Sequence, residues 1–568
     1  MQPNSKTITA LLCATSAIGI TAYQAFAQAP QAPAAPLHLQ VPGRDLNQQP
    51  IAFSGATLTF QSENAASIAV TTPEKEKLTP IRMEVGNALS TLTPAADGTL
   101  RGQVVASLSE MRAENERRIR MKDQEIPIFE GRTQVAVRKA SSFVIANEQL
   151  TTGKAIPIIS VGNPANIDIA RSLLINDPSV TQDPTRTRTS CATPSLGAWS
   201  FGHLMNQMAN QQQTGISGSE LARRWLQRFQ FPQVVNDQIS NPHPAVVSQI
   251  LAKWQALSGA NNPLDMGKAP FRLLAIVNRV DLRKSTSYGG GDAGEARFVF
   301  GAVDPQTCAP LQFTAIFEYE VPRKLCNDIK AWAKRWKDLD QHPLGSPAYR
   351  AALQLITDDF TKANANPTKQ NGSALGQLRT NEKLGPPDWQ LREFRLSPAN
   401  GGHLEQVTVK QTPANSFDKT PTLASFVASK LNAILAEKHS VPLQFPTGTP
   451  FLAAHADTPN LNWTWDQGTG KVITNRPARH KFALNTCNGC HGGEANTILF
   501  KHIDVAGYTP TAAGLSKFLT GEVNRPDPAD GSPARSFNDL KRRAADLDAL
   551  INSPCFMHPF MAPGTMVH

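Results

Sequence analysis

Three successive stretches rich in apolar residues limit most strongly how this chain can fold. They span residues 271–280, 296–303 and 311–321. Strands that follow one another without an intervening helix are typical of antiparallel sheets. Helical spacing of apolar residues occurs before and after them, at 219–229, 244–257, 328–340 and 349–360. We therefore expect a mixed α+β fold around an antiparallel sheet rather than an alternating α/β fold.

The length of 568 residues is too great for one ordinary core, so several domains are expected. Period-two alternation from about residue 50 to 165 predicts a β-rich region. We expect a signal peptide at 1–27, a Pro/Ala-rich linker at 28–45, a β-rich domain at 46–165, a central α+β domain at 166–440, a connecting segment at 441–475 and a small α-helical domain at 476–568.

The first residues have the pattern of an export signal. Lys6 precedes an apolar stretch from Ile8 to Ala22, and Ala25-Phe26-Ala27 is a small-x-small cleavage sequence. Cleavage is expected before Gln28, which predicts a periplasmic or secreted protein. No second segment is apolar enough for a membrane span, so no integral span is expected after cleavage.

Close to the other end, Cys487-Asn488-Gly489-Cys490-His491 forms a C-x-x-C-H motif. Two thiols at i and i+3 lie on the same side of a helical turn, and each can add to one vinyl group of a haem. The adjacent histidine then donates a nitrogen to the iron. A zinc site would need a second pair of ligands, and a redox dithiol would need a thioredoxin-like context. The sequence therefore predicts one covalently attached haem c.

Residues 476–551 resemble a minimal monohaem cytochrome c domain. A helix runs into the motif, a short helix is expected at 515–519, and an amphipathic helix follows from residue 536. The resemblance covers about a seventh of the chain and implies His491 as the proximal iron ligand. The segments 271–283 and 482–491 also resemble a group of uncharacterised secreted bacterial proteins, which brings no activity with it.

The sixth iron ligand departs from the cytochrome c pattern, in which a methionine precedes the last helix. Here no methionine lies between His491 and Ser536. The resemblance implies that His502 supports His491 rather than facing it. Met561 is the favoured ligand and Met557 the alternative. An open iron or a tail histidine (His558 or His568) also remain open.

Four further cysteines would be exported with the chain, and an oxidising compartment allows them two disulfides. Cys308 and Cys326 are nearest in sequence and form the first expected pair. Cys191 and Cys555 would form the second. The alternative is that some of them remain buried thiols.

A charged pattern accompanies the expected strands. Arg279, Asp281 and Arg283 share one strand face by period two. Glu295, Arg297, Glu318 and Glu320 fall on neighbouring strands. This pattern is typical of a salt-bridged sheet face; the alternative is a buried ionic site for a substrate.

Two classes of function follow. The first is one-electron transfer or redox chemistry with a partner protein, with a haem-dependent oxidoreductase activity left open. The second is a ligand-binding, sensing or structural protein in which the central domain carries the role. The net charge of +10 is modest for this length, and no run of Lys or Arg exceeds three residues. Nucleic acid is therefore not an expected partner, and the oligomeric state is not indicated.

Overall fold

The structure is a computed structural model. It describes residues 43–45, 50–51, 55–71, 81–85, 88–104, 108–120, 123, 125–130, 133–139, 150–157, 167–283, 293–323, 326–384, 389–435, 437, 439–457, 463, 475–497, 501–529 and 531–552. The expected signal peptide, most of the linker and the C-terminal tail lie outside these ranges. Cys555, Met557, Met561, His558 and His568 are part of that tail.

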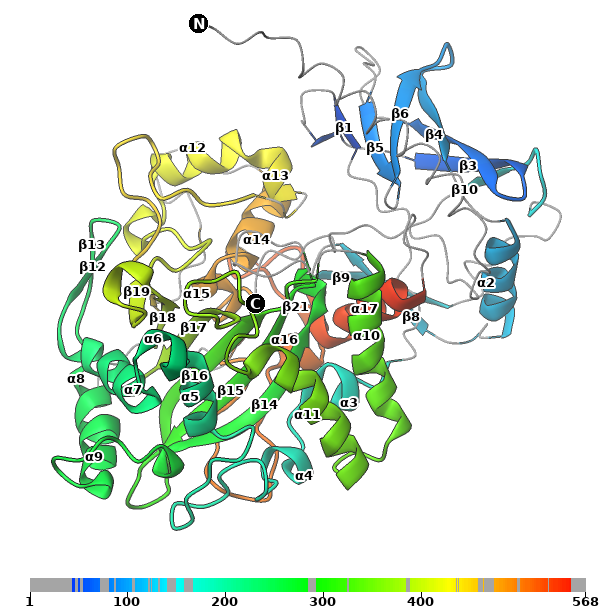
Figure 1. Ribbon diagram of the computed structural model, residues 1–568. Coiled ribbons are helices and arrows are strands. Elements are labelled where there is room, and N and C mark those ends of the chain that lie inside the picture. Colours follow the sequence, from blue (N-terminus) through cyan, green and yellow to red (C-terminus); the bar gives the residue numbers. More distant parts are fainter. Residues whose placement is uncertain are drawn as a thin grey trace, which may run out of the picture.

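The largest body is built on an antiparallel sheet of eight strands (Figure 1). In spatial order these are β11 (Leu174–Ile175), β14 (Phe271–Arg279), β15 (Glu295–Val303), β16 (Pro310–Glu320), β17 (Leu375–Glu382), β18 (Gln390–Leu396) and β19 (Leu404–Val407), with β20 (Ala456–Asp457) also pairing with β18. The three apolar stretches predicted as strands are β14, β15 and β16. The expected mixed α+β class with an antiparallel sheet is confirmed.

One face of this sheet is covered by helices and is rich in aromatic residues. Alternate residues of the central strands, such as Phe298, Phe300 and Phe317, are fully buried there. Phe201 stacks on Phe271 with ring centroids 4.0 Å apart. The helices of this region are α3 (Ile169–Ser172), α4 (Pro178–Thr181), α5 (Phe201–Ala209), α6 (Gln211–Thr214), α7 (Gly218–Gln227), α8 (Pro244–Val246), α9 (Ala252–Ser258), α10 (Cys326–Asp338) and α11 (Pro347–Thr361).

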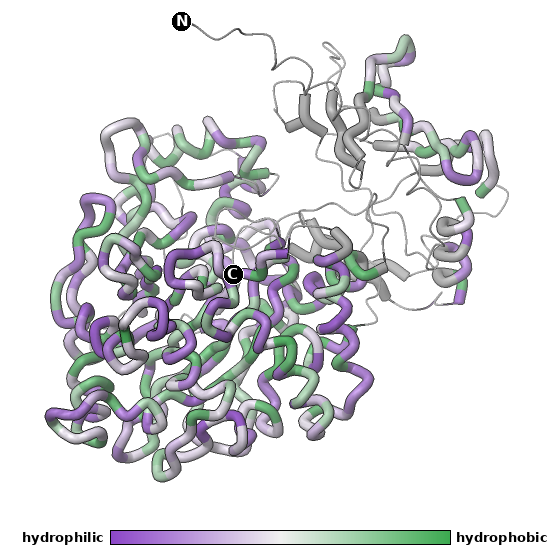
Figure 2. The backbone as a smooth tube through the Cα atoms, viewed as in Figure 1, coloured by the Kyte–Doolittle hydropathy of each residue, from purple (hydrophilic) through white to green (hydrophobic). Residues whose placement is uncertain are grey.

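The opposite face of the sheet packs against the C-terminal part of the chain. Val277 and Val299 share a hydrophobic cluster with Cys490, Phe518 and Leu540. The elements here are α12 (Pro421–Ser429), α13 (Leu431–Leu435), α14 (Arg476–Leu484), α15 (Cys487–Cys490), α16 (Lys517–Thr520), β21 (Glu522–Arg525), β22 (Arg535–Phe537) and α17 (Asp539–Asn552). In Figure 2 the hydrophobic stretches follow the central strands, and many outer loops are hydrophilic.

The N-terminal part forms a second antiparallel sheet with α2 (Leu108–Arg120) beside it. Its strands, in spatial order, are β10 (Ala155–Pro157), β3 (Gly55–Ser62), β4 (Ala65–Thr71), β7 (Thr99–Val104), β6 (Ala88–Pro94), β5 (Ile81–Val85), β1 (Gly43–Asp45) and β2 (Pro50–Ile51). The remaining strands are the hairpin β12 (Gln233–Val235) and β13 (Gln238–Ser240), and the pair β8 (Glu125–Glu130) and β9 (Thr133–Lys139). Because β9 also pairs with β22, the N-terminal and C-terminal parts share one small sheet.

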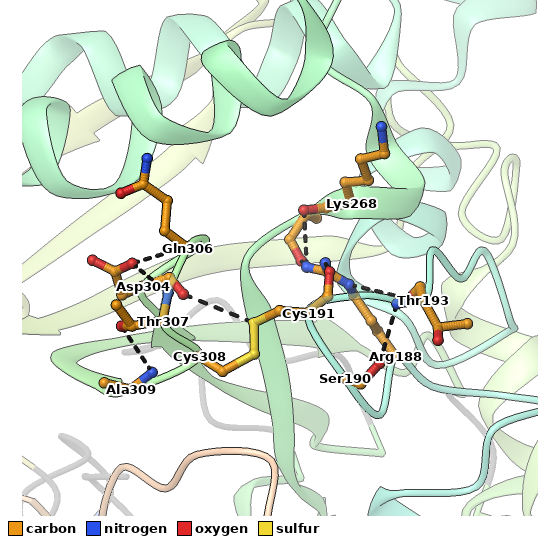
Figure 3. The surroundings of a disulfide bond; sticks show 11 residues. Arg188, Ser190, Cys191, Thr193, Lys268, Asp304, Gln306, Thr307, Cys308 and Ala309 are labelled. Carbon is orange, nitrogen blue, oxygen red and sulfur yellow. Dashed lines mark hydrogen bonds between the residues drawn. A yellow bond between two sulfur atoms is a disulfide. The ribbon is translucent and has the colours of Figure 1, made fainter.

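The disulfide joins Cys191 to Cys308, with Cα atoms 5.8 Å apart (Figure 3). The expected pairs Cys308–Cys326 and Cys191–Cys555 are therefore wrong. Cys308 precedes the 11-residue strand β16 and Cys326 follows it. A strand of that length spans roughly 35 Å, whereas a disulfide needs Cα atoms within about 7 Å. The Arg188 guanidinium donates a hydrogen bond to the carbonyl oxygen of Cys191 (2.6 Å) and so helps to hold the loop that carries Cys191.

Among the helices that the structure describes, none combines the length and the apolar character needed to cross a bilayer.

Candidate functional site

The C-x-x-C-H motif occupies the short helix α15 and the residue that ends it. Thr486 caps this helix, since its side-chain oxygen accepts a hydrogen bond from the Gly489 backbone N–H at 3.0 Å. Cys487 and Cys490 are present as thiols and are fully buried. Burial raises the pKa of the Cys487 thiol to about 12, although the Arg379 charge opposes this rise. The two sulfur atoms therefore lie on one helical turn, and the Cys487 thiol is neutral at pH 7.

Neighbouring segments hold the motif in place. The Cys487 backbone N–H donates to the Thr412 hydroxyl at 2.8 Å. The Trp463 indole N–H donates to the Asn488 side-chain oxygen at 2.9 Å, so Trp463 packs on the motif as a structural support. Gly489 has no room for a side chain, because an added Cβ would lie 2.0 Å from the Ala483 carbonyl oxygen. The glycine of the motif thus allows α15 to pack closely against α14.

A cavity of about 70 Å³ lies between the motif and the central sheet. His491 is one of its lining residues, and both cysteines pack against other lining residues. Cys490 shares a hydrophobic cluster with Val277, Val299, Phe518 and Leu519, and Cys487 shares one with Leu391. The apolar part of the lining consists of Leu174, Val277, Val299, Ile316, Leu391, Ile503, Phe518 and Leu519. This volume is smaller than the roughly 300–1,000 Å³ of ligand pockets, so the residues around it would have to move apart to admit a haem.

The sheet side of the cavity also carries charged residues, in register across the strands. Val277 on β14 lies opposite Arg297 on β15, which lies opposite Glu318 on β16. One step along, Ile316 lies opposite Arg379 on β17. These side chains point to the cavity because successive residues of a strand face opposite sides, and Phe298 and Phe317 face the helices.

The charged residues form a buried ion-pair network. The Arg297 guanidinium contacts Glu295 at 2.5 Å and Glu318 at 3.2 Å. The Arg379 guanidinium lies 3.6 Å from Glu318 and 3.3 Å from Glu393. Burial raises the pKa of Glu295, and Arg297 only partly offsets it. Burial acts on Glu318 in the same direction, but Arg297 and Arg379 together lower its pKa.

The expectation that Arg279, Asp281 and Arg283 share one strand face is wrong. Strand β14 ends at Arg279, and a 3₁₀ turn (Val280–Leu282) follows. The turn lets the Arg279 guanidinium contact Asp281 at 2.9 Å, while Arg283 bonds to Asp546 on α17 at 2.8 Å. All three residues are about 1% exposed, so they belong to a buried network and not to a solvated face.

His502 lies beside His491, with ring centroids 4.4 Å apart. One ring nitrogen of His502 is 2.9 Å from the Ser516 hydroxyl, and the other is 3.4 Å from the Cys490 sulfur. Metal–imidazole bonds are about 2 Å long, so two rings this close leave no room for an iron between them. The two imidazoles therefore occupy one side of the cavity.

A second ionic cluster ties the motif segment together. The Arg479 guanidinium on α14 donates to Glu494 at 2.8 and 2.9 Å and to Asp527 at 2.8 Å. His480 also bonds to Glu494, and Arg535 on β22 bonds to Asp527. Glu494 is 2% exposed. Its pKa is lowered to about 2, because Arg479 and His480 outweigh the effect of burial.

Sequence reasoning missed two of the cavity residues, Arg379 and Arg543. Arg379 lies on β17, whose residues were not recognised as a strand. Arg543 lies on α17 in the Lys541-Arg542-Arg543 run, which resembles a solvated helix face. No local signal identified either residue, because residues 375–382 (LGQLRTNE) do not alternate between apolar and polar.

The expected sixth ligands, Met561 and Met557, lie outside the described residues. Within the described lining of the cavity, the imidazoles belong to His491 and His502, and no methionine is present. Among all the residues that the structure describes, no group of three or more His, Cys, Asp or Glu side chains is arranged to bind a metal ion.

Comparisons with models of protein families, with curated proteins and with solved structures find no match to this chain.

Proposed function

We propose that this chain is an exported protein with one haem c, attached through Cys487 and Cys490 and ligated by His491, and that it transfers single electrons. The segment from residue 476 would act as a cytochrome c-like haem domain, and the β-rich and central domains would precede it. A periplasmic or secreted location, with a redox partner protein, belongs to the same proposal.

One observation carries this proposal: the C-x-x-C-H motif borders an apolar space that is lined by His491 and by side chains that pack on both thiols. The lining of this space is largely apolar, which suits a porphyrin. A haem bound there would supply one-electron chemistry at iron.

The chain's own residues would determine how the cofactor behaves. Cys487 and Cys490 would fix its position, and His491 would hold the iron from one side. The Cys490 and Ser516 contacts of His502 keep that imidazole beside His491. Phe518, Leu519 and the sheet valines would exclude water, and a dry surrounding is one of the factors that set a haem potential.

The alternative is a sensing, ligand-binding or structural protein in which the haem reports or stabilises. The central region supports this alternative. Strands β14 to β18 form a wall of the cavity, and a protein that only carries electrons would not need them. The two functions differ in whether the iron exchanges electrons readily.

Redox titration of the purified full-length protein, produced with c-type haem maturation, tests the proposal. We expect haem that stays with the polypeptide on a denaturing gel, together with a reversible one-electron wave and rapid reduction by a small cytochrome. Covalent haem that resists both reductant and oxidant would support the alternative. Haem that extracts completely into acidified organic solvent would contradict both.

We further expect Met561 to supply the sixth ligand, with Met557 as the alternative. Pro554 ends the helical tendency after α17, so the tail can return to the haem. The oxidised protein should then show the weak long-wavelength band of methionine–iron ligation, and Met561→Ala should remove it while Met566→Ala leaves it. A high-spin spectrum of the intact protein would instead indicate an open iron and favour an enzyme or sensor.

A further inference from the structure

A second and larger cavity, of about 670 Å³, lies where strands β16, β17 and β18 meet at one end of the central sheet. We call it the strand-end cavity. Its volume is within the roughly 300–1,000 Å³ of ligand pockets. It is separate from the space beside His491, because the described linings of the two have no residue in common. Its polar side chains include Gln213, Glu320, Lys369, Gln370, Asn371 and Arg395.

Glycine residues keep the strand-end cavity open. Gly376 is the extra residue of a bulge in β17, because Glu318 lies opposite Gln377 and Tyr319 lies opposite Leu375. A Cβ at Gly376 would lie 3.1 Å from Cγ of Glu320 and would push this side chain aside. The space is therefore part of the way the strands end.

The charges around the strand-end cavity are balanced. The Lys369 amino group lies 2.7 Å from the Glu320 carboxylate. The Arg395 guanidinium lies 3.4 Å from Glu393, which is fully buried behind it. Each charged side chain of the lining thus has a partner of opposite sign. A ligand with a net charge would disturb this balance, whereas a neutral ligand would not.

Several hydrogen-bonding atoms of the lining remain unused within the described part of the chain. Lys369 approaches Oε2 of Glu320, and Oε1 has no hydrogen-bond partner. Arg395 donates through Nη2 to Gln377 and Glu393, and Nη1 donates to no described residue. A hydroxyl group both donates and accepts a hydrogen bond. One hydroxyl can therefore satisfy the carboxylate, and a neighbouring hydroxyl can satisfy the guanidinium.

Apolar side chains complete the lining. Leu375, Leu396 and Pro398 border the same space as the polar groups. A sugar ring has this mixed character, because its hydroxyls project from the edge while its C–H groups form apolar patches. The combination of balanced charge, unused donors and acceptors, and aliphatic contacts therefore fits a sugar better than an ion or a purely apolar molecule.

We propose that the strand-end cavity binds a neutral polyhydroxylated ligand of the sugar class. This site is additional to the proposed haem site and does not depend on it. Among the described lining residues, Glu320 is the only carboxylate. Canonical glycoside hydrolysis uses a pair of carboxylates, so the proposal is one of binding and not of cleavage.

Arg395→Gln is the variant that tests the site. It removes the unused guanidinium donors, and Glu393 keeps Arg379 at 3.3 Å, so no carboxylate is left alone. Arg395→Lys serves if the glutamine variant does not fold. It keeps the positive charge but lacks the planar set of donors, so it should also weaken binding.

Arg335→Gln is the matched control. The Arg335 side chain is 38% exposed, close to the 35% of Arg395, and it does not line the strand-end cavity. Its carboxylate partner Asp359 keeps Arg323 at 3.0 Å. The control thus removes one arginine from an ion pair of similar exposure elsewhere on the protein.

The measurement is isothermal titration calorimetry of the full-length protein. The probes are glucose, galactose, maltose and cellobiose, and free glutamate and free lysine serve as charged comparisons. We expect saturable binding of at least one of the four sugars and weaker or no binding of the two amino acids. Arg395→Gln should weaken that binding roughly tenfold, the loss expected for a hydrogen bond to a charged group. Arg335→Gln should leave it unchanged.

Three outcomes would overturn the inference and leave the proposed haem function intact. The first is that none of the four sugars binds, even at high millimolar concentration. The second is sugar binding of the same affinity in Arg395→Gln and Arg395→Lys, which would place it elsewhere on the protein. The third is tighter binding of glutamate or lysine than of every sugar, lost in Arg395→Gln, which would assign the cavity to a charged ligand.

Discussion

Replacing Cys487 and Cys490 together by serine is expected to abolish covalent haem. A thioether forms from a sulfur atom and a haem vinyl group, and a serine hydroxyl does not replace the sulfur. Haem staining after denaturing electrophoresis, and the mass of the intact chain, should change from haem-bearing to haem-free. Either single substitution keeps one attachment point and should give a lower yield of covalent haem rather than none.

The matched control is Cys191→Ser with Cys308→Ser, which also removes two sulfur atoms but at the disulfide. Loss of a disulfide costs about 2–4 kcal/mol of stability. Because this variant can therefore yield less folded protein, the haem content should be expressed per folded chain. We expect that control to keep its haem. Covalent haem in Cys487→Ser/Cys490→Ser would show attachment elsewhere and would contradict the assignment of the motif.

The parts of this structure that could be predicted depend on neighbours in sequence. Strands β14 to β16 follow from three successive stretches rich in apolar residues, and helix α15 follows from the spacing of Cys487 and Cys490. The chemistry of the motif is local as well, because two cysteines and one histidine within five positions suffice to suggest a haem attachment site.

The parts that could not be predicted depend on contacts between distant segments. The cavity joins His491 to Arg297 and Arg379, which lie more than a hundred positions earlier in the chain. Sequence distance was also misleading for the disulfide, because β16 carries Cys308 and Cys326 apart and a loop brings Cys191 back. Only the order of strands in the sheet settles such pairings.

The charged face shows a related limit. The sequence placed Arg297 and Glu318 on neighbouring strands, and the preferred interpretation was a salt-bridged sheet face. The C-terminal segment covers that face, however, so the same residues become a buried network with shifted pKa values. Whether a charged face is solvated depends on what packs on it, which a local pattern does not contain.

Glu494→Gln is expected to destabilise the fold strongly at neutral pH. The buried carboxylate accepts hydrogen bonds from two nitrogens of the Arg479 guanidinium and also bonds to the His480 ring. Lowering its pKa from 4.5 to about 2 corresponds to a stabilisation on the order of 3 kcal/mol. The glutamine variant keeps the shape but loses the charge, and thermal or urea unfolding at pH 7 should show the difference. Glu116→Gln, at a carboxylate that is 68% exposed and pairs with Arg120 on α2, should change stability little.

The pH dependence gives the sharper test of the same contact. A carboxyl whose pKa is lower in the folded state than in the unfolded chain contributes its full stability above the unfolded value of 4.5. That contribution decreases as the pH falls toward the folded value of about 2, where both states become protonated. The difference in unfolding free energy between the unmodified protein and Glu494→Gln should therefore be constant from pH 7 to about 5 and shrink below it. A difference that stayed constant down to pH 3 would mean that Glu494 acts through its shape and hydrogen bonds, and not through its charge.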